Sequence, residues 1–288
     1  MLSPMSDPKT ITLRGGRTLG YREYGDPDGA PVVNCHGGTL CGLDLAAWSE
    51  AARALGVRVV SPDRPGLGES TAVPGRTTAD WADDVEDLAT ALGLDRFGVL
   101  GWSMGGQYAV ACASRLATLV TKTVVIAGAL PLDDDATFLE LNAMDKRFTN
   151  LALRKPRSAR YALAAFGALA RHAPKAWCKG AAKDLVPEEA AVLTGPTGRT
   201  IAAAAAVAGR GGEGMAEEYR AWVRPWGFTL AAITTPIVYW QGDRDALIPP
   251  KWADELARRT PGSTVHAVPG AGHFLGYTHT EAVLSEFT

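Results

Sequence analysis

The sequence predicts an α/β fold with a mostly parallel, doubly wound central sheet and an inserted helical cap. Short apolar runs with strand character alternate with helix-like segments through the first 130 residues, and again after residue 229. Between these two parts, residues 131–229 are rich in alanine and arginine and have little strand character. Alternation of this kind indicates parallel strands with helices on both faces of the sheet.

Each expected element rests on a run of the sequence. Residues 9–13 and 19–24 form an expected hairpin, with Gly15 and Gly16 at a turn whose backbone angles glycine tolerates. Ligands of a parallel sheet bind at the carboxyl ends of its strands, so the reactive residues are expected there. Further strands are expected at 31–34, 57–61, 97–101, 120–127, 236–240 and 264–268, and helices at 43–55, 78–92, 107–116 and 252–259.

Pro131 interrupts the alternation and divides the chain into three parts. We expect a first part of the core at 1–130, a helical cap at 131–229 inserted after the sixth strand, and a second part of the core at 230–288. The glycine-rich stretch 209–214 is expected to be a flexible joint inside the cap, because glycine has few backbone restrictions.

The composition limits the classes of partner. A chain of 288 residues with 47% hydrophobic content can bury a large core, and a net charge of −2 gives no electrostatic reason to expect nucleic acid or an anionic membrane. Residues 1–7 hold neither a cationic start nor an apolar run, and the apolar runs 161–170 and 201–209 are too short to span a bilayer. We expect a cytoplasmic protein that acts on a small molecule; its oligomeric state is not indicated.

The four cysteines give no sign of a disulfide or of a metal site. They form no C-x-x-C pair, and no histidine cluster with metal-ligand spacing accompanies them. Free buried thiols are the favoured interpretation, and a redox role for Cys35 and Cys41 is a weaker one because buried cysteine usually acts as a small apolar residue. The four are Cys35, Cys41, Cys112 and Cys178.

A serine lies at the apex of a predicted strand, turn and helix. The segment Gly-Trp-Ser-Met-Gly-Gly at 101–106 follows the apolar run 97–100 and precedes the helix-prone run 107–116. In a G-x-S-x-G turn the serine backbone is strained and its hydroxyl is exposed, while the glycines let the strand and the helix approach each other. Ser103 is therefore the candidate nucleophile.

A serine hydroxyl needs a base to take its proton, and the base needs a carboxylate to orient it. His273 lies in a glycine-flanked loop after the strand at 264–268, and it is the expected base. Two carboxylates, Asp243 and Asp245, follow the strand at 236–240. The chain order is therefore serine, aspartate, histidine, each just beyond the end of a predicted strand.

With this order the chain resembles the α/β-hydrolase fold superfamily over nearly its whole length. The resemblance implies a serine hydrolase with a cap that roofs the active site, and it implies no metal and no organic cofactor. Four motifs carry it: Cys35-His36-Gly37-Gly38, the segment from Ser61-Pro62-Asp63-Arg64 to Ser70, the turn at 101–106, and Gly242-Asp243-Arg244-Asp245 together with Gly272-His273.

The family pattern also distinguishes the two acids. A glycine, two residues, an aspartate, and then an apolar pair before proline select Asp245 as the orienting acid. Asp243 is then a turn residue whose side chain satisfies local backbone donors. The acids at 133–135 are a poorer third choice, because they lie several positions beyond the preceding strand.

An oxyanion hole needs two backbone N–H groups near the nucleophile. The N–H after the nucleophile belongs to Met104, and the loop after the strand at 31–34 supplies the second, which we assign to Gly38 with Gly37 as the fallback. The polar residues behind this loop are expected to brace it rather than to react, and they are His36, Asp63 and Arg64.

Aromatic residues near the site and in the cap are candidates to line an apolar pocket. Packing among the cap helices explains each cap aromatic equally well. The pocket candidates are Trp102, Trp177, Trp222, Trp226 and Phe274, and the cap also offers Phe166 and Phe228.

The implied activity is hydrolysis of a small-molecule carboxylic ester through an acyl-enzyme. Serine at the turn argues against epoxide hydrolases and haloalkane dehalogenases, which carry aspartate there. A proline-type aminopeptidase is one alternative, although Thr39 and Leu40 replace the Pro-Gly usual in that family, and its substrate amine would be held by Glu213, Glu217 or Glu218. A carbon–carbon bond hydrolase with the same triad and a non-catalytic ligand-binding receptor are the others.

Overall fold

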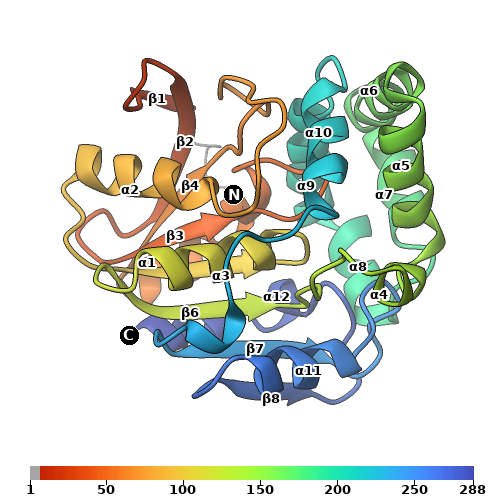
Figure 1. The fold of residues 1–288 in the computed structure, drawn as a ribbon. Helices are drawn as coiled ribbons and strands as arrows, with labels where there is room; N and C mark the ends of the chain where they lie inside the picture. Colours follow the sequence, from red (N-terminus) through yellow and green to blue (C-terminus); the bar gives the residue numbers. More distant parts are fainter. Residues whose placement is uncertain (1–6) are drawn as a thin grey trace.

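A computed structural model describes residues 7–288 and shows an eight-stranded sheet in the order β1-β2-β4-β3-β5-β6-β7-β8 (Figure 1). The expected α/β class with a mostly parallel sheet is confirmed. Most of the segment considered for a signal peptide lies outside the described residues. The strands are β1 (Lys9–Thr12), β2 (Thr18–Gly25), β3 (Ala30–Cys35), β4 (Val57–Pro62), β5 (Phe97–Trp102), β6 (Val120–Ile126), β7 (Ile237–Gly242) and β8 (Thr264–Val268).

The sheet combines an antiparallel edge with a parallel body. β1 and β2 form the expected hairpin, and Gly15 (φ 90°) and Gly16 (φ 81°) occupy the left-handed backbone region at its turn. β2 pairs antiparallel with β4, and every later pair is parallel. The carboxyl ends of β3, β5, β6, β7 and β8 therefore meet at one edge.

Helices cover both faces of the sheet. The two glycines of β5 show this, because they lie on opposite sides of the strand. A Cβ at Gly101 would lie 2.6 Å from Ala109 Cβ of α3, whereas the opposite face at Gly98 is filled by the ring of Phe287. The helices of the core are η1 (Asp44–Trp48), α1 (Ser49–Ala54), α2 (Trp81–Leu92), α3 (Gly105–Arg115), η2 (Leu230–Ala232), α11 (Lys251–Arg259), α12 (Leu275–Thr278), α13 (Thr280–Leu284) and η3 (Ser285–Phe287).

Seven α-helices lie between β6 and β7, within residues 131–229. Four of them begin with proline at the first helical turn, where the missing N–H costs no helix bond. Figure 1 shows the group beyond the ends toward which β3, β6 and β7 point. The seven are α4 (Asp135–Leu139), α5 (Ala143–Arg154), α6 (Pro156–His172), α7 (Pro174–Ala181), α8 (Pro187–Thr194), α9 (Pro196–Ala208) and α10 (Glu213–Trp222).

Three glycines of the turn at 209–214, where we expected a flexible joint, are closely packed against neighbouring segments. A Cβ at Gly209 would lie 2.6 Å from Gly167 Cα, and one at Gly212 or Gly214 would overlap a backbone oxygen of a neighbouring segment. These glycines permit close packing between α6, α9, α10 and the core. Neighbouring segments thus occupy the space that side chains would need at 209, 212 and 214, whereas Gly211 is exposed and has open space around it.

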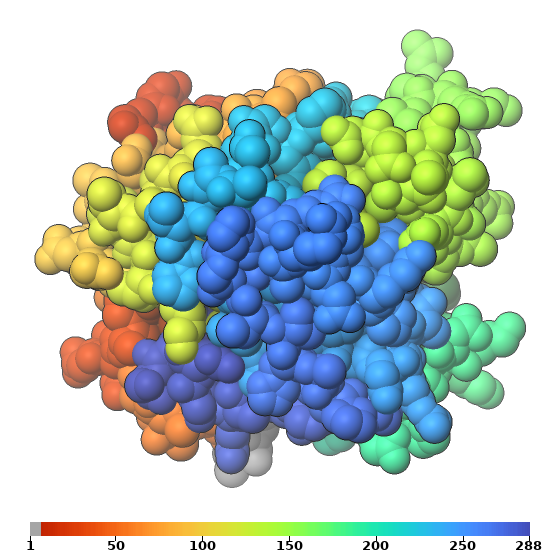
Figure 2. Space-filling view, turned by 60° about the horizontal axis from the view of Figure 1, so that its bottom comes forward, coloured from red at the N-terminus to blue at the C-terminus, as the bar shows by residue number. Residues whose placement is uncertain are grey.

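The first inserted helix also contacts the last part of the core. Lys251 Nζ and Trp252 Nε1 of α11 each donate a hydrogen bond of 2.8 Å to the Glu140 carboxylate at the end of α4. Figure 2 shows this yellow-green start of the insertion lying against the blue C-terminal part of the chain. Within the described residues, no helix combines the length and apolar character needed to cross a membrane.

Candidate active site

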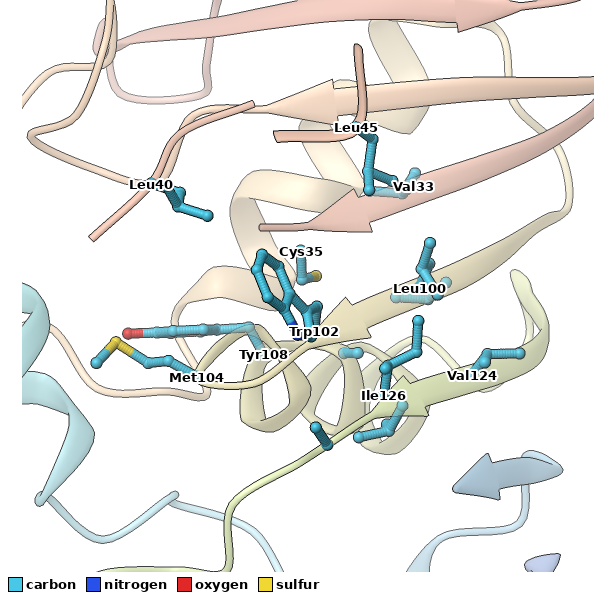
Figure 3. Close-up of a cluster of buried hydrophobic side chains, with 14 of the residues drawn as sticks. Val33, Cys35, Leu40, Leu45, Leu100, Trp102, Met104, Tyr108, Val124 and Ile126 are labelled. Atoms are coloured by element: carbon cyan, nitrogen blue, oxygen red, sulfur yellow. The ribbon is translucent and has the colours of Figure 1, made fainter. Parts of the chain in front are cut away.

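Ser103 lies in the expected sharp turn between β5 and α3. Its φ of 56° is left-handed, a region that few residues other than glycine adopt. Two other non-glycine residues at this edge of the sheet share it: Thr39 (φ 58°), in the loop after β3, and Ala127 (φ 49°), just after β6. Figure 3 shows the apolar core of β3, β5 and β6 leading to Trp102 and Met104, the neighbours of Ser103.

Glycine at 105 allows the turn to be this sharp. A Cβ there would overlap the carbonyl oxygen of Cys35 at the end of β3. The sequence pattern thus has a physical cause, since only a residue without a side chain lets α3 begin directly behind the strand ends. The Ser103 side chain is partly exposed and lines a cavity of about 760 Å³.

His273 lines the same cavity and is paired with Asp245. Its Nδ1 lies 3.0 Å from Asp245 Oδ2, while Asp245 Oδ1 accepts hydrogen bonds from the N–H groups of Leu247 (2.8 Å) and Ile248 (2.9 Å). An ionised carboxylate beside Nδ1 fixes the proton on that nitrogen and leaves Nε2 as an acceptor. Among the described residues, no hydrogen bond joins Ser103 Oγ to His273.

The charges of the pair support each other. Burial alone would lower the pKa of His273, but the carboxylate of Asp245 holds that pKa above its ordinary value. Burial likewise opposes ionisation of Asp245, yet His273 and the Leu247 and Ile248 N–H groups bring the pKa of Asp245 below its ordinary value. The ionised aspartate is therefore the stable form.

The alternative acids, Asp243 and the exposed acids at 133–135, lie elsewhere. Asp243 is exposed and accepts a 2.7 Å hydrogen bond from the N–H of Gly270, which is the local role expected of a turn residue. Asp134 caps α4 by accepting a hydrogen bond from the N–H of Thr137 (2.9 Å). The structure thus brings Asp245, and neither of these, to His273.

Two backbone N–H groups are available beside Ser103. Gly38 and Met104 both line the cavity, and a Cβ at Gly38 would lie 3.2 Å from Met104 Cε. None of the hydrogen bonds found for residues 7–288 uses the N–H of Gly38 or of Met104. By contrast, the N–H of Gly37 donates to Asp44 Oδ2 (3.1 Å). The fallback donor is therefore already occupied.

Asp44 anchors this loop. It is fully buried and accepts hydrogen bonds from Gly37, from Asn34 Nδ2 (2.9 Å) and from the N–H of Leu45 (2.8 Å). Burial raises the pKa of Asp44 to about 7, although these three donors oppose the rise.

The residues behind the loop brace it, as expected. His36 Nε2 accepts a hydrogen bond from the N–H of Arg64 (3.2 Å), and burial together with the charge of Arg64 lowers the pKa of His36 well below its ordinary value. His36 is thus neutral and occupied. Asp63 pairs with Arg22 at 3.0 Å and accepts the N–H of Gly42 at 2.8 Å.

The Arg64 side chain extends from the core to α10. It pairs with Glu218, which pairs with Arg76 as well, and all three side chains are buried. Burial opposes the charge, but the two arginines hold the pKa of Glu218 at about 2. The guanidinium groups also lie over the Tyr108 ring, at 4.6 Å for Arg64 and 5.6 Å for Arg76.

The structure contradicts the suggestion that Glu213, Glu217 or Glu218 holds a substrate amine. None of the three lines the cavity. Glu217 binds the N–H of Gly75 together with two arginines, and Glu213 pairs with one of these on the surface. Each carboxylate therefore already has an arginine partner within the protein.

Four of the five predicted pocket aromatics line the cavity, and one does not. Trp102, Trp177, Trp222 and Phe274 form parts of its wall. Trp226 was wrongly placed there, because the chain has left α10 and packs this indole against Phe228, 5.7 Å between ring centroids. Of the other two aromatic candidates within residues 131–229, Phe166 lines the cavity and Phe228 does not.

The sequence analysis missed several wall residues. Tyr219 lies one helical turn before Trp222, so the spacing along α10 could have indicated it. Asp145 of α5 accepts hydrogen bonds from Tyr219 Oη (2.9 Å) and Asn142 Nδ2 (2.6 Å). Burial raises the pKa of Asp145, which these donors and His273 oppose.

The wall has a distinct charge character. Its two carboxylates are Asp145 and Asp184, and no lysine or arginine contributes to the part of the wall formed by described residues. The remainder is mostly apolar and aromatic. Such a cavity favours neutral or cationic groups over anionic ones.

Comparison with known proteins places the fold in a family. The chain matches the alpha/beta hydrolase fold over residues 30–280. A thermophilic esterase from Thermogutta terrifontis has a similar structure, with a TM-score of 0.71, 24% sequence identity and coverage of 98% of this chain and 96% of that one. A bromoperoxidase from Bacillus anthracis is equally similar, with a TM-score of 0.71, 22% identity and coverage of 98% and 99%.

Curated relatives match over shorter regions. A proline iminopeptidase from Xanthomonas citri is 37% identical over 102 residues, which cover 34% of this chain and 32% of that one. The non-heme chloroperoxidase CPO-A1 from Kitasatospora aureofaciens is 35% identical over 124 residues, covering 42% and 43%. The match thus spans less than half the length of either relative. The family match, the sheet order and the serine turn together establish that this chain belongs to the alpha/beta hydrolase fold family.

Proposed function

We propose that this protein is a serine hydrolase that cleaves a small-molecule carboxylic ester. One observation carries the proposal: Ser103, the Asp245-paired His273, and the unoccupied N–H groups of Gly38 and Met104 all line one cavity. These are the nucleophile, the base with its orienting acid, and the oxyanion donors that acyl transfer requires.

The reaction would proceed in two steps. His273 Nε2 takes the Ser103 proton as Oγ attacks the substrate carbonyl, and the N–H groups of Gly38 and Met104 donate to the oxyanion. His273 then returns the proton to the leaving alkoxide, so that an alcohol departs and an acyl-enzyme remains. Water, activated by the same imidazole, hydrolyses the acyl-enzyme and restores Ser103. Asp245 stays ionised throughout and stabilises the imidazolium.

The substrate is proposed to be uncharged or cationic near the inserted helices. We assign residues 131–229 the role of a cap, because α5, α6, α7, α9 and α10 all contribute wall residues opposite the triad. A carboxylate on the substrate would face Asp145 without any lysine or arginine nearby, and it would lose its hydration for no new partner. The aromatic wall instead suits an apolar group.

A proline-type aminopeptidase is the second candidate, supported by relatives of that name and by Asp145. Glu213, Glu217 and Glu218 do not line the cavity. Of the two carboxylates that do, Asp145 interacts with His273 and would face a substrate amine. Hydrolysis of L-proline p-nitroanilide tests this candidate directly. A specificity constant for it above that of every ester would overturn the esterase proposal.

The main test combines labelling with turnover. Intact-mass analysis after fluorophosphonate treatment should show one adduct at Ser103, and p-nitrophenyl esters should be hydrolysed by the wild type and not by Ser103→Ala. A folded wild-type protein that is neither labelled nor active would refute the hydrolase proposal in favour of a binding role.

Charge preference is tested with a matched pair of esters. In p-nitrophenyl hydrogen glutarate and p-nitrophenyl 5-methylhexanoate, a carboxylate and an isopropyl group of similar shape end the same chain. We expect kcat/KM at pH 7.5 to be at least about tenfold higher for the neutral ester, a difference of about 1.4 kcal/mol. Equal values would contradict the proposed electrostatic selection.

A further inference from the structure

A carboxylate of α8 reaches the loop that carries His273. Glu189 is 1% exposed, and its Oε1 accepts a 2.7 Å hydrogen bond from the N–H of Gly272, the residue directly before His273. A Cβ at position 272 would lie 2.6 Å from Glu189 Oε2. Glycine is therefore needed there for the carboxylate to approach the backbone so closely.

This carboxylate lacks the partner that a buried charge normally has. No lysine or arginine pairs with Glu189 in the described part of the chain, and its Oε2 accepts no hydrogen bond there. Leaving a buried carboxylate without an ion-pair partner is costly. The cationic group that faces it is the imidazolium form of His273. Burial raises the pKa of Glu189, and the Gly272 and Phe274 N–H groups and the charge of His273 oppose that rise.

We propose that Glu189 is a positioning residue for His273, through which the inserted helices act on the base. This inference rests on the proposed function. The hydrogen bond to Gly272 fixes the loop from the side of α8, while Trp102 Nε1 donates to the carbonyl oxygen of His273 (2.9 Å) from the side of β5. The backbone that carries the imidazole is thus held by hydrogen bonds on both sides of His273.

In its ionised form Glu189 also adds negative charge near the imidazole. Three carboxylates face His273 from three different segments: Asp245 after β7, Asp145 on α5 and Glu189 on α8. Each favours the imidazolium that forms when Ser103 is deprotonated. Asp245 bonds directly to the ring, whereas Glu189 acts at longer range and through the loop.

The first test separates charge from hydrogen bonding. Glu189→Gln keeps an oxygen for the Gly272 N–H and removes the charge, so we expect kcat at pH 8.5 within about twofold of the wild type. The acid limb of kcat/KM should move to lower pH, because the imidazolium has lost one stabilising carboxylate. The matched control is Glu188→Gln, an exposed neighbour on the same helix, and it should leave both kcat and the pH profile unchanged.

The second test removes the hydrogen bond as well. Glu189→Ala should lower kcat at pH 8.5 by about tenfold, with KM within about twofold, because a mispositioned base slows the chemistry and not the binding of substrate. Circular dichroism must first show that each variant is folded. An unchanged pH profile in Glu189→Gln together with unchanged kcat in Glu189→Ala would overturn the proposal and leave Glu189 as a packing residue.

A measurement that does not depend on turnover tests this proposal separately from the proposed hydrolase function. NMR titration of the His273 imidazole, assigned by loss of its signal in His273→Gln, reports its pKa even in a protein that hydrolyses nothing. A lower His273 pKa in Glu189→Gln supports the electrostatic role whether or not an ester is cleaved. No shift would refute that role in an active and in an inactive enzyme alike.

Discussion

The contrast between Asp245→Asn and Asp243→Asn tests the assignment of the acid most sharply, because the two residues lie two positions apart and differ in their contacts. In Asp245→Asn the amide oxygen can keep the Oδ1 position, which accepts the Leu247 and Ile248 N–H groups. The amide nitrogen then takes the Oδ2 position, 3.0 Å from His273 Nδ1. The amide N–H group is a donor and cannot accept a hydrogen bond from Nδ1–H, so the His273 proton must lie on Nε2 and leave Nδ1 as the acceptor.

The magnitude follows from this change of tautomer. With the proton on Nε2, His273 cannot accept the Ser103 proton, and the wrong tautomer in a serine triad lowers kcat by about 10⁴-fold, or about 5 kcal/mol. Asp243→Asn keeps an oxygen for the Gly270 N–H on an exposed turn, and we expect its kcat to stay within about twofold.

The assay is p-nitrophenyl acetate turnover at pH 8, with circular dichroism and thermal melting to show that both variants are folded. A tautomeric defect should appear in kcat with little change in KM. Equal losses in the two variants, or an Asp245→Asn variant with more than a tenth of wild-type kcat, would refute the assignment.

Other outcomes follow from the same contacts. Glu218→Ala leaves the buried Arg64 and Arg76 without their carboxylate partner and should lower the free energy of unfolding by about 3–5 kcal/mol in denaturant titration. Glu213→Ala, at an exposed pair, should stay within about 0.5 kcal/mol, and similar losses in the two variants would contradict the role of the buried network. Trp222→Phe should shift the ester chain-length preference toward bulkier acyl groups and Trp226→Phe should not, as a panel of p-nitrophenyl esters would show. Because the pKa of His273 is raised and the base must be neutral, kcat/KM should fall as pH drops through a value above about 6.5, and an acid limb below that value would argue against the Asp245 pairing.

The sequence predicted the features that depend on local pattern. Strand and turn residues are determined by their neighbours, so the hairpin at Gly15, the turn at Ser103 and the strand at 264–268 were all found at or near their observed positions. The choice between Asp243 and Asp245 also came from local spacing, and the pairing of Asp245 with His273 agrees with it.

Contacts between distant segments were beyond such reasoning. From the sequence alone, Glu218 could be an unpaired acid available to a substrate. The structure pairs it with Arg64 and Arg76, which lie more than 140 residues earlier in the chain. Trp222 and Trp226 are both buried, but only Trp222 lines the cavity, because the chain has left α10 before it reaches Trp226. A pattern can thus indicate burial without indicating which side of a wall a ring occupies.

The left-handed backbones of Thr39, Ser103 and Ala127 limit how stable this fold can become. Each opposes folding by about 1–3 kcal/mol, against a net stability that for domains is about 5–15 kcal/mol. Glycine would relieve the strain at 39 and 127, where no side-chain chemistry is assigned. At 103 the proposed chemistry needs the serine hydroxyl, so this strain cannot be removed without loss of the activity. Selection for thermal tolerance must therefore act at positions other than 103.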